Sequence, residues 1–220
     1  MTLPVLSLLE TRVLGVLVEK QHTVPDSYPL TLNALVSGAN QKTARDPVIE
    51  ASEAEVQAAL DHLKALSLVV ESSGGRVMRY AHNAGKALGL PPQSIALLAV
   101  LFLRGPQTAG ELRINCDRLH KFADISAVEG FLHELAERPA GALVVELARQ
   151  PGSRENRWAH LLSGPRPEEQ HPSVPQSASR ADEHQELAAL RARVEALEAG
   201  VSELRQLIAA LQAGAPLKTL

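Results

Sequence analysis

The sequence predicts a mainly helical protein with small β-hairpins, in which one helical unit occurs twice and a coiled-coil helix follows. Residues 79–82 read Arg-Tyr-Ala-His and residues 157–160 read Arg-Trp-Ala-His, each at the end of a candidate hairpin. In the helix before each hairpin, Val56 corresponds to Val128, 72 residues later, and the neighbouring apolar positions follow with the same shift. The C-terminal segment carries an uninterrupted heptad pattern. Repetition on this scale indicates one supersecondary unit used twice.

The first predicted helix begins after Ser7. Apolar side chains recur at helical spacing between Leu6 and Leu17, and Ser7 forms a capping box with Glu10. We expect this helix to end near Lys20, where a polar segment begins.

A short second helix is predicted between Pro29, which suits a first helical turn, and Gly38, which suits a helix end. The connection that follows, residues 39–48, is polar and is long for a turn between packed helices. Long polar loops on a compact scaffold often carry function.

Ser52 and Glu55 form another capping box, from which a third helix is predicted to run to about Leu66. Two strands, 68–70 and 76–80, are then predicted to pair as a hairpin. Three helices followed by a hairpin is the order of a winged-helix domain. The sequence therefore predicts a first winged-helix domain over residues 1–83.

A linker over 84–93 and a second winged-helix domain over 94–163 complete the folded part. Its first helix is expected to stop at Gly105, and its hairpin is expected to pair 142–146 with 157–160.

Capping residues predict where the second and third helices of this second copy begin. Thr108 and Glu111 form a capping box for the second helix. The third helix begins at Asp124 if the repeat keeps its register, or at Ser126 if that serine forms its own box. The sequence leaves both starts open.

The C-terminal part is predicted to be a flexible tether, 164–183, and a coiled-coil helix, 184–213. Valine and isoleucine predominate at the a positions and leucine fills the d positions, which favours a parallel two-stranded coil and hence a homodimer. The alternative is a single amphipathic helix that folds back on its own domain. The predicted dimerisation residues are Leu187, Leu190, Val194, Leu197, Val201, Leu204, Ile208 and Leu211.

Composition narrows the function classes. Hydrophobic residues make up 45% and charged residues 21% of the 220 positions, as in an ordinary globular protein. The single cysteine, Cys116, excludes an intramolecular disulfide and is expected to be a small buried hydrophobe. No apolar run is long enough to span a bilayer, so we expect a cytoplasmic protein without a membrane partner. Because no motif for a catalytic, metal or cofactor site is present, we expect no enzymatic activity and no cofactor.

Double-stranded DNA is the first partner that a winged-helix fold suggests, because the third helix can enter the major groove while the wing contacts the backbone. Gln57 could read adenine and Lys64 could meet a phosphate, but Asp61 lies between them and would be repelled. The net charge of −3 is spread evenly, which counts against general attraction to nucleic acid. The predicted nucleic-acid-binding residues are Lys42, Arg45, Gln57, Lys64, Arg76, Arg79, Arg154 and Arg157.

Five strings of the sequence resemble a known family: Glu-Lys at 19–20, Pro-Asp-Ser-Tyr-Pro-Leu at 25–30, Asn-Gln-Lys at 40–42, Arg-Asp-Pro-Val at 45–48 and Val-Gln-Ala-Ala-Leu at 56–60. Through them the chain resembles the YceH family of uncharacterised bacterial proteins. The resemblance implies a tandem winged-helix fold and transfers no catalytic residue.

The resemblance also directs attention to the long loop rather than to the exposed face of the third helix. It implies a partner-binding surface of Tyr28, Asn40, Gln41, Lys42 and Arg45. Two functions follow as hypotheses. The sequence favours a dimeric winged-helix DNA-binding regulator, and the alternative is an adaptor whose winged helices bind a protein.

Overall fold

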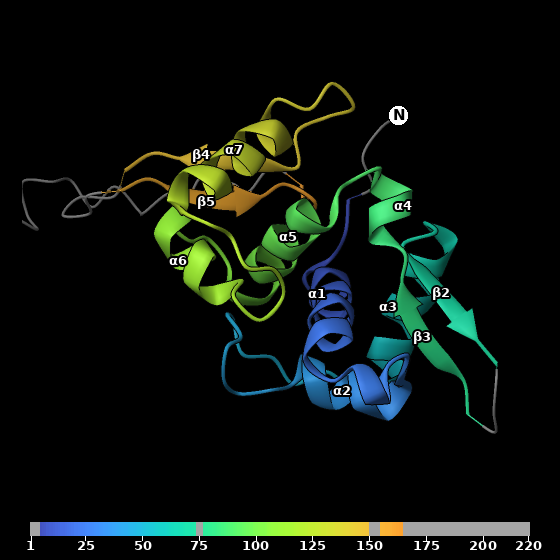
Figure 1. Cartoon of the computed structure of the whole chain (residues 1–220). Helices are drawn as coiled ribbons and strands as arrows, with labels where there is room; N and C mark the ends of the chain where they lie inside the picture. Colours follow the sequence, from blue (N-terminus) through green and yellow to red (C-terminus); the bar gives the residue numbers. More distant parts are fainter. Residues whose placement is uncertain (1–4, 74–76, 150–154, 165–220) are drawn as a thin grey trace, which may run out of the picture. The chain divides into compact units, whose positions relative to one another are not determined.

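The computed structural model describes residues 5–73, 77–149 and 155–164. These residues are mainly helical and carry two small antiparallel sheets, which confirms the predicted fold class at this level (Figure 1).

The first copy of the repeated unit consists of three α-helices, a short 3₁₀ helix and a three-stranded sheet. In chain order they are α1 (Leu8–Thr23), the 3₁₀ helix (Pro25–Ser27), β1 (Leu30–Thr31), α2 (Leu32–Ala39), α3 (Glu53–Ala65), β2 (Val69–Ser72) and β3 (Arg79–His82). The strand order is β1-β3-β2, with Leu30 opposite Tyr80 and Val69 opposite His82.

The second copy repeats this order after one additional helix. Its elements are α4 (Ala84–Leu88), α5 (Pro92–Arg104), α6 (Ala109–Asn115), α7 (Ile125–Ala136), β4 (Val144–Leu147) and β5 (Arg157–His160). Strands β4 and β5 pair with Val144 opposite His160. An isolated bridge between Gln107 and Trp158 occupies the place that β1 has in the first copy.

The helix starts agree with the caps expected from sequence. Capping boxes form at Ser7, Ser52 and Thr108. Helix α7 begins after Asp124, whose carboxylate accepts from the Ala127 N–H at 2.8 Å. The repeat therefore keeps its register, and the alternative start at Ser126 is wrong.

Several boundaries differ from the predictions. Helix α2 begins after Thr31, whose hydroxyl accepts from the Ala34 N–H, so Pro29 lies outside the helix. The residues just before Thr31 pair with β3 instead, because a chain in extended conformation there can complete the sheet. Helix α1 continues to Thr23, beyond the end expected near Lys20.

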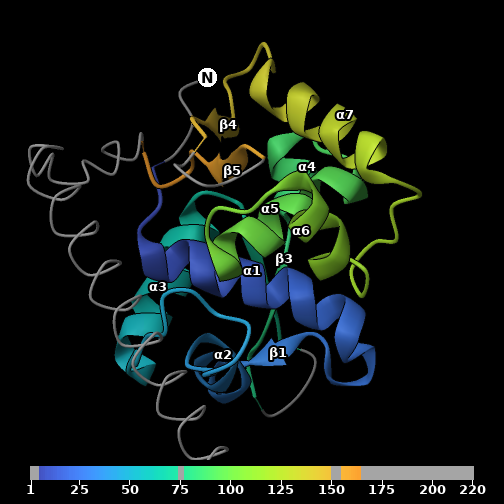
Figure 2. The same ribbon diagram turned by 90° about the vertical axis from the view of Figure 1, so that its left-hand side faces the viewer.

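The two copies lie within one compact unit, Met1–Arg166. Helices α1 and α5 lie side by side (Figure 2). Every residue from Thr11 to Val18 and from Ser94 to Leu103 is buried, so each helix is covered on all sides. Helices that are apolar around their whole circumference must pack within a core. The segment predicted as a linker, 84–93, accordingly holds α4 and the first residues of α5.

Helices α1 and α5 approach each other closely at Gly15. A Cβ atom added there would lie 3.0 Å from Cγ of Leu103 and 3.2 Å from Cβ of Phe102. The absence of a side chain at Gly15 thus lets the two helices approach.

Other buried side chains match expectation. Cys116 is fully buried, and its burial raises the pKa of the thiol to about 12, so it is an inert core residue. Tyr80 and Trp158 are each 4% exposed and pack within the core.

Candidate functional site

The loop over residues 39–48, singled out by the sequence, is held by two buried arginines. Arg12 of α1 is fully buried and donates to the carbonyl oxygens of Ala39 at 3.3 Å and Pro47 at 2.7 Å. Because these carbonyls lie at the two ends of the loop, one guanidinium group fixes both ends.

Arg45 holds the middle of the same loop. Its side chain is completely buried, and its Nη1 and Nη2 atoms donate to the two carboxylate oxygens of Glu19 at 3.1 and 2.7 Å. It also donates to the carbonyls of Gly38 at 3.1 Å and Ala44 at 2.9 Å. Burial alone would raise the pKa of Glu19, but the hydrogen bond and the charge of Arg45 lower it below its usual value.

These contacts decide what the 39–48 loop can offer to a partner. Asn40 is turned inward, where its amide makes two hydrogen bonds with the backbone of Ala51, at 2.7 and 2.8 Å. The amide of Gln41 donates within the loop to Thr43. Lys42 is exposed and, within the part of the chain that the structure describes, makes no hydrogen bond or ion pair. Of the loop residues predicted to bind a partner, Asn40 and Arg45 therefore support the loop, whereas Lys42 is free to make contacts.

Tyr28, the remaining member of the predicted partner surface, supports the first sheet. Its hydroxyl oxygen accepts from the backbone N–H of His82 at 2.8 Å. Burial raises the pKa of Tyr28 to about 12. The side chain is thus half-buried, with its polar end already satisfied.

The outward face of α3 is occupied by its own charges. Lys64 forms ion pairs with Asp61 at 2.9 Å and with Glu71 of β2, and these hydrogen bonds raise its pKa. Gln57 donates to Asp61 at 3.1 Å and accepts from the Tyr80 hydroxyl at 3.2 Å. Both α3 side chains that were predicted to contact DNA, Gln57 and Lys64, are therefore engaged within the protein.

The wing arginines that the structure describes contact backbone carbonyls. Arg79 donates to Ser27 at 3.4 Å and Pro29 at 2.7 Å, and Arg157 donates to Pro106. Two further predicted DNA contacts, Arg76 and Arg154, lie outside the described residues. So do the predicted coiled-coil helix and all of its heptad positions.

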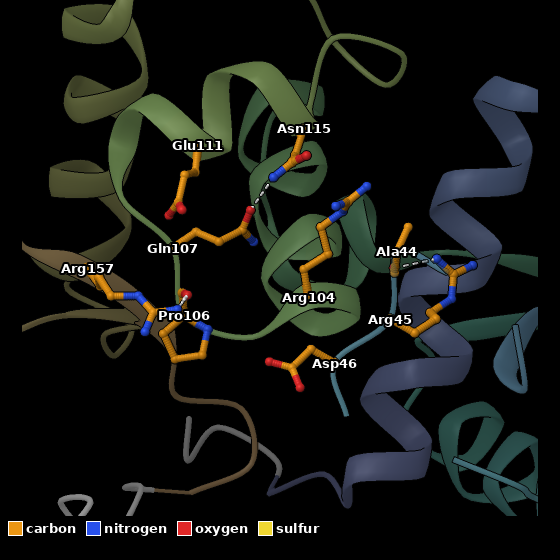
Figure 3. Close-up of a pocket in the computed structure, with 9 residues that line it drawn as sticks. All are labelled: Ala44, Arg45, Asp46, Arg104, Pro106, Gln107, Glu111, Asn115 and Arg157. Atoms are coloured by element: carbon orange, nitrogen blue, oxygen red, sulfur yellow. Dashed lines mark hydrogen bonds between the residues drawn. The ribbon is translucent and has the colours of Figure 1, made fainter. Parts of the chain in front are cut away.

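A polar pocket lies where the 39–48 loop meets the second copy (Figure 3). It has a volume of about 350 Å³, and we call it the seam pocket. Its lining residues come from the loop, from the end of α5, from α6 and from β5: Ala44, Arg45, Asp46, Arg104, Pro106, Gln107, Glu111, Asn115 and Arg157. The backbone joins the two sides, because the Asp46 N–H donates to the Leu103 carbonyl at 2.8 Å.

The floor of the seam pocket is a fixed pair of amides. Gln107 is only 5% exposed, donates to the Gly105 carbonyl at 3.3 Å and accepts from the Asn115 side chain at 2.6 Å. Sequence reasoning missed this site because its residues are far apart in the chain and carry no motif. Gly105 and Pro106 were read only as the stop of a helix.

Two kinds of site are absent among the described residues. No group of three or more His, Cys, Asp or Glu side chains is placed to hold a metal ion. Likewise, no helix in the described ranges has the length and apolar character needed to cross a membrane.

Comparison with known proteins gives a family. A sequence model described as "Protein of unknown function, DUF480" matches residues 6–153. A UPF0502 protein from Dechloromonas aromatica (strain RCB) is 64% identical over 208 residues, which cover 93% of this chain and 95% of that protein. A UPF0502 protein from Methylibium petroleiphilum is 61% identical over 203 residues, covering 90% of this chain and 85% of the relative. The chain therefore belongs to the DUF480 family.

Proposed function

We propose that this chain is a non-enzymatic cytoplasmic adaptor that binds a protein partner through two tandem winged-helix units and forms homodimers through its C-terminal heptads. The repeated order of three helices and a hairpin supports the winged-helix assignment, as does the resemblance to the YceH family. The heptad pattern between Leu187 and Leu211 supports the coiled coil, since a seam of apolar a and d residues needs a partner helix.

The observation that carries the choice of a protein partner over DNA is the charge arrangement on α3. In a winged helix this is the helix that enters the major groove. Here the ammonium group of Lys64 is neutralised by Asp61 and Glu71, and the amide of Gln57 is held by Asp61. Reading a base would require these interactions to break, while the exposed carboxylates would be repelled by phosphates.

The corresponding helix of the second copy, α7, supports the same choice. Its exposed side chains include Glu129, His133 and Glu134. The Nδ1 atom of His133 already contacts the Glu129 carbonyl at 2.7 Å. An acidic helix in both copies suits a protein surface better than a phosphate backbone.

The 39–48 loop is the surface that we assign to the protein partner. It presents the free ammonium group of Lys42 and the exposed apolar side chain of Val48, which is 53% accessible. Because Arg12 and Arg45 hold the loop in place, a partner would not have to order it, and a preorganised loop binds at a lower entropic cost.

DNA binding is the second candidate, and one observation favours it. The fold order is that of DNA-binding winged helices, and Lys42 offers a positive charge that has no partner among the described residues. Phosphate contacts at these positions would fix the protein on a duplex without reading its sequence.

A titration of random-sequence duplex DNA with the full-length protein separates the two functions. Fluorescence anisotropy would be measured at about 50 and 200 mM salt, where a protein that makes several phosphate contacts loses orders of magnitude in affinity. The adaptor function predicts no salt-sensitive affinity. A steep salt dependence that falls by about one unit of slope in the Lys42→Ala variant would establish DNA binding instead.

Affinity purification from cells tests the protein partner directly. Lys42→Glu and Val48→Asp should both release a partner that the wild type retains. Lys86→Glu is the matched control, because Lys86 is an exposed lysine on α4, outside the loop. If the loop variants and the control retain the same proteins, the loop is not the binding surface.

A further inference from the structure

The seam pocket combines charges of both signs that do not neutralise one another. Asp46 and Glu111 contribute carboxylates, and Arg104 and Arg157 contribute guanidinium groups. Within the described part of the chain, none of these four side chains forms an ion pair. A third arginine of the lining, Arg45, is by contrast already paired with Glu19. The pocket charges are thus held apart by the scaffold.

Two of the four groups make no side-chain hydrogen bond within the described part of the chain, although the charge of Asp46 acts on the buried Arg12. Asp46 and Arg104 make no hydrogen bond through their side chains among the described residues. Glu111 uses one carboxylate oxygen for the N–H of Thr108, and Arg157 donates to the Pro106 carbonyl, so each retains further capacity. In Figure 3 Glu111 and Arg157 lie on one side of the pocket and Arg104 on the other, with Asp46 along the lower edge.

The backbone around these groups is fixed. Gly105 adopts a φ of +72°, and a Cβ atom added there would lie 3.4 Å from Oδ2 of Asp46. The missing side chain therefore leaves space beside that carboxylate. The backbone N–H of Asp46 is hydrogen-bonded to the Leu103 carbonyl, and Arg45 fixes the 39–48 loop. The backbone that carries the Asp46 carboxylate is therefore held at the pocket.

We infer that the seam pocket binds a small zwitterion of the free amino-acid type. A guanidinium group, with Arg104 the freer of the two, donates hydrogen bonds to the carboxylate of the ligand, because this pairing is charge-assisted and can be bidentate. Asp46 accepts the ammonium group. The volume of about 350 Å³ lies at the lower end for small-molecule sites, which suits a ligand of this size.

The charges argue against the simpler alternative of an anion such as phosphate. Two arginines alone would favour an anion, but Asp46 and Glu111 line the same pocket and would repel it. A ligand with both charges satisfies both pairs of side chains. This inference is independent of the partner surface proposed above, because it concerns a small molecule and can be tested without a partner.

Isothermal titration calorimetry on the full-length protein tests the proposal with defined probes. The twenty free L-amino acids are titrated one at a time, followed, for any that binds, by its N-acetyl form, its C-terminal amide and inorganic phosphate. We expect at least one free amino acid to bind and both blocked forms to bind roughly tenfold more weakly or worse, since each lacks one charged hydrogen-bonding group. Binding of no amino acid, or equal binding of the N-acetyl form or phosphate, would overturn the inference.

Variants then locate the site. Arg104→Gln and Asp46→Asn should each lower the affinity for the free amino acid roughly tenfold or more. The N-acetylated form keeps its carboxylate but has no ammonium group, so Asp46→Asn should leave its weak binding unchanged. Lys86→Gln, which removes an exposed charge outside the pocket, should bind as the wild type does. If all three variants bind the amino acid equally, the ligand lies elsewhere and the assignment to this pocket is wrong. The comparison of free and blocked ligands on the wild type remains decisive even if a variant fails to fold.

Discussion

Replacing Arg45 with alanine removes the central support of the 39–48 loop. The substitution deletes two hydrogen bonds to Glu19 and one each to the carbonyls of Gly38 and Ala44. It also leaves the Glu19 carboxylate, whose side chain is 16% exposed, with Lys20, at 3.1 Å, as its remaining ion-pair partner in place of the buried Arg45. Removing one member of a buried ion pair typically costs about 3–5 kcal/mol. For a folded unit of this size, the melting temperature should fall by roughly 6–20 °C.

Thermal unfolding followed by circular dichroism measures this change in melting temperature. The size of the change should also depend on pH. The folded-state pKa of Glu19 is lowered, so its contribution to stability is present above the ordinary glutamate pKa and is lost as pH falls through the lowered folded-state value. The difference in melting temperature between wild type and Arg45→Ala should therefore be largest at neutral pH and should shrink as pH falls below about 4.

Lys42→Ala is the matched control, because Lys42 is exposed on the same loop without a partner among the described residues. Its melting temperature should stay within about 1–2 °C of the wild type, as for most surface substitutions. A melting temperature for Arg45→Ala equal to that of Lys42→Ala would show that the Glu19 pair does not support the fold, and the argument from its burial would fail.

Three further predictions concern the shared core, the sheet and the tail. Gly15→Val should lower the free energy of unfolding by about 1–3 kcal/mol in chemical denaturation, because α1 and α5 meet at Gly15. At Gly130 an added Cβ atom meets nothing within 4 Å, so Gly130→Val should change the free energy of unfolding by less than about 0.5 kcal/mol. Burial lowers the pKa of His82 to about 4, so the unfolded state binds the proton of this histidine more readily than the folded state does. Stability should therefore fall as pH drops from about 6.5 to 4. In the His82→Gln variant, the melting temperature should depend less on pH over this range. The double substitution of Val201 and Leu204 by aspartate should convert a dimer to a monomer in analytical ultracentrifugation, and a wild-type monomer would refute the coiled coil.

Local signals in the sequence predicted the helices well. Capping boxes mark helix starts by a spacing of three residues, and the repeat extended this reasoning from Ser52 to Asp124. The strands were harder to place. The predicted strand 76–80 is observed as β3, Arg79–His82, because the pairing of a hairpin depends on cross-strand register, which no local signal fixes.

The union of the two copies and the seam pocket could not be predicted from local patterns. An apolar pattern shows that a helix face is buried but not what buries it, so the sequence could not say that α1 packs on α5. Arg45 was predicted to bind a partner or nucleic acid because its own acceptors are distant in the chain: it reaches Glu19, 26 residues away. A buried arginine is recognised only when its acceptors are seen.

The close approach at Gly15 has a consequence for how the two copies can diverge. Once a repeated unit has merged its cores, its halves no longer vary independently. A larger residue at Gly15 would be tolerated only with a smaller one at Leu103, whose Cγ lies 3.0 Å from the position of an added Cβ. The first helix of each copy is therefore under a constraint imposed by the other. We expect paired changes in relatives to concentrate along the line where α1 and α5 meet.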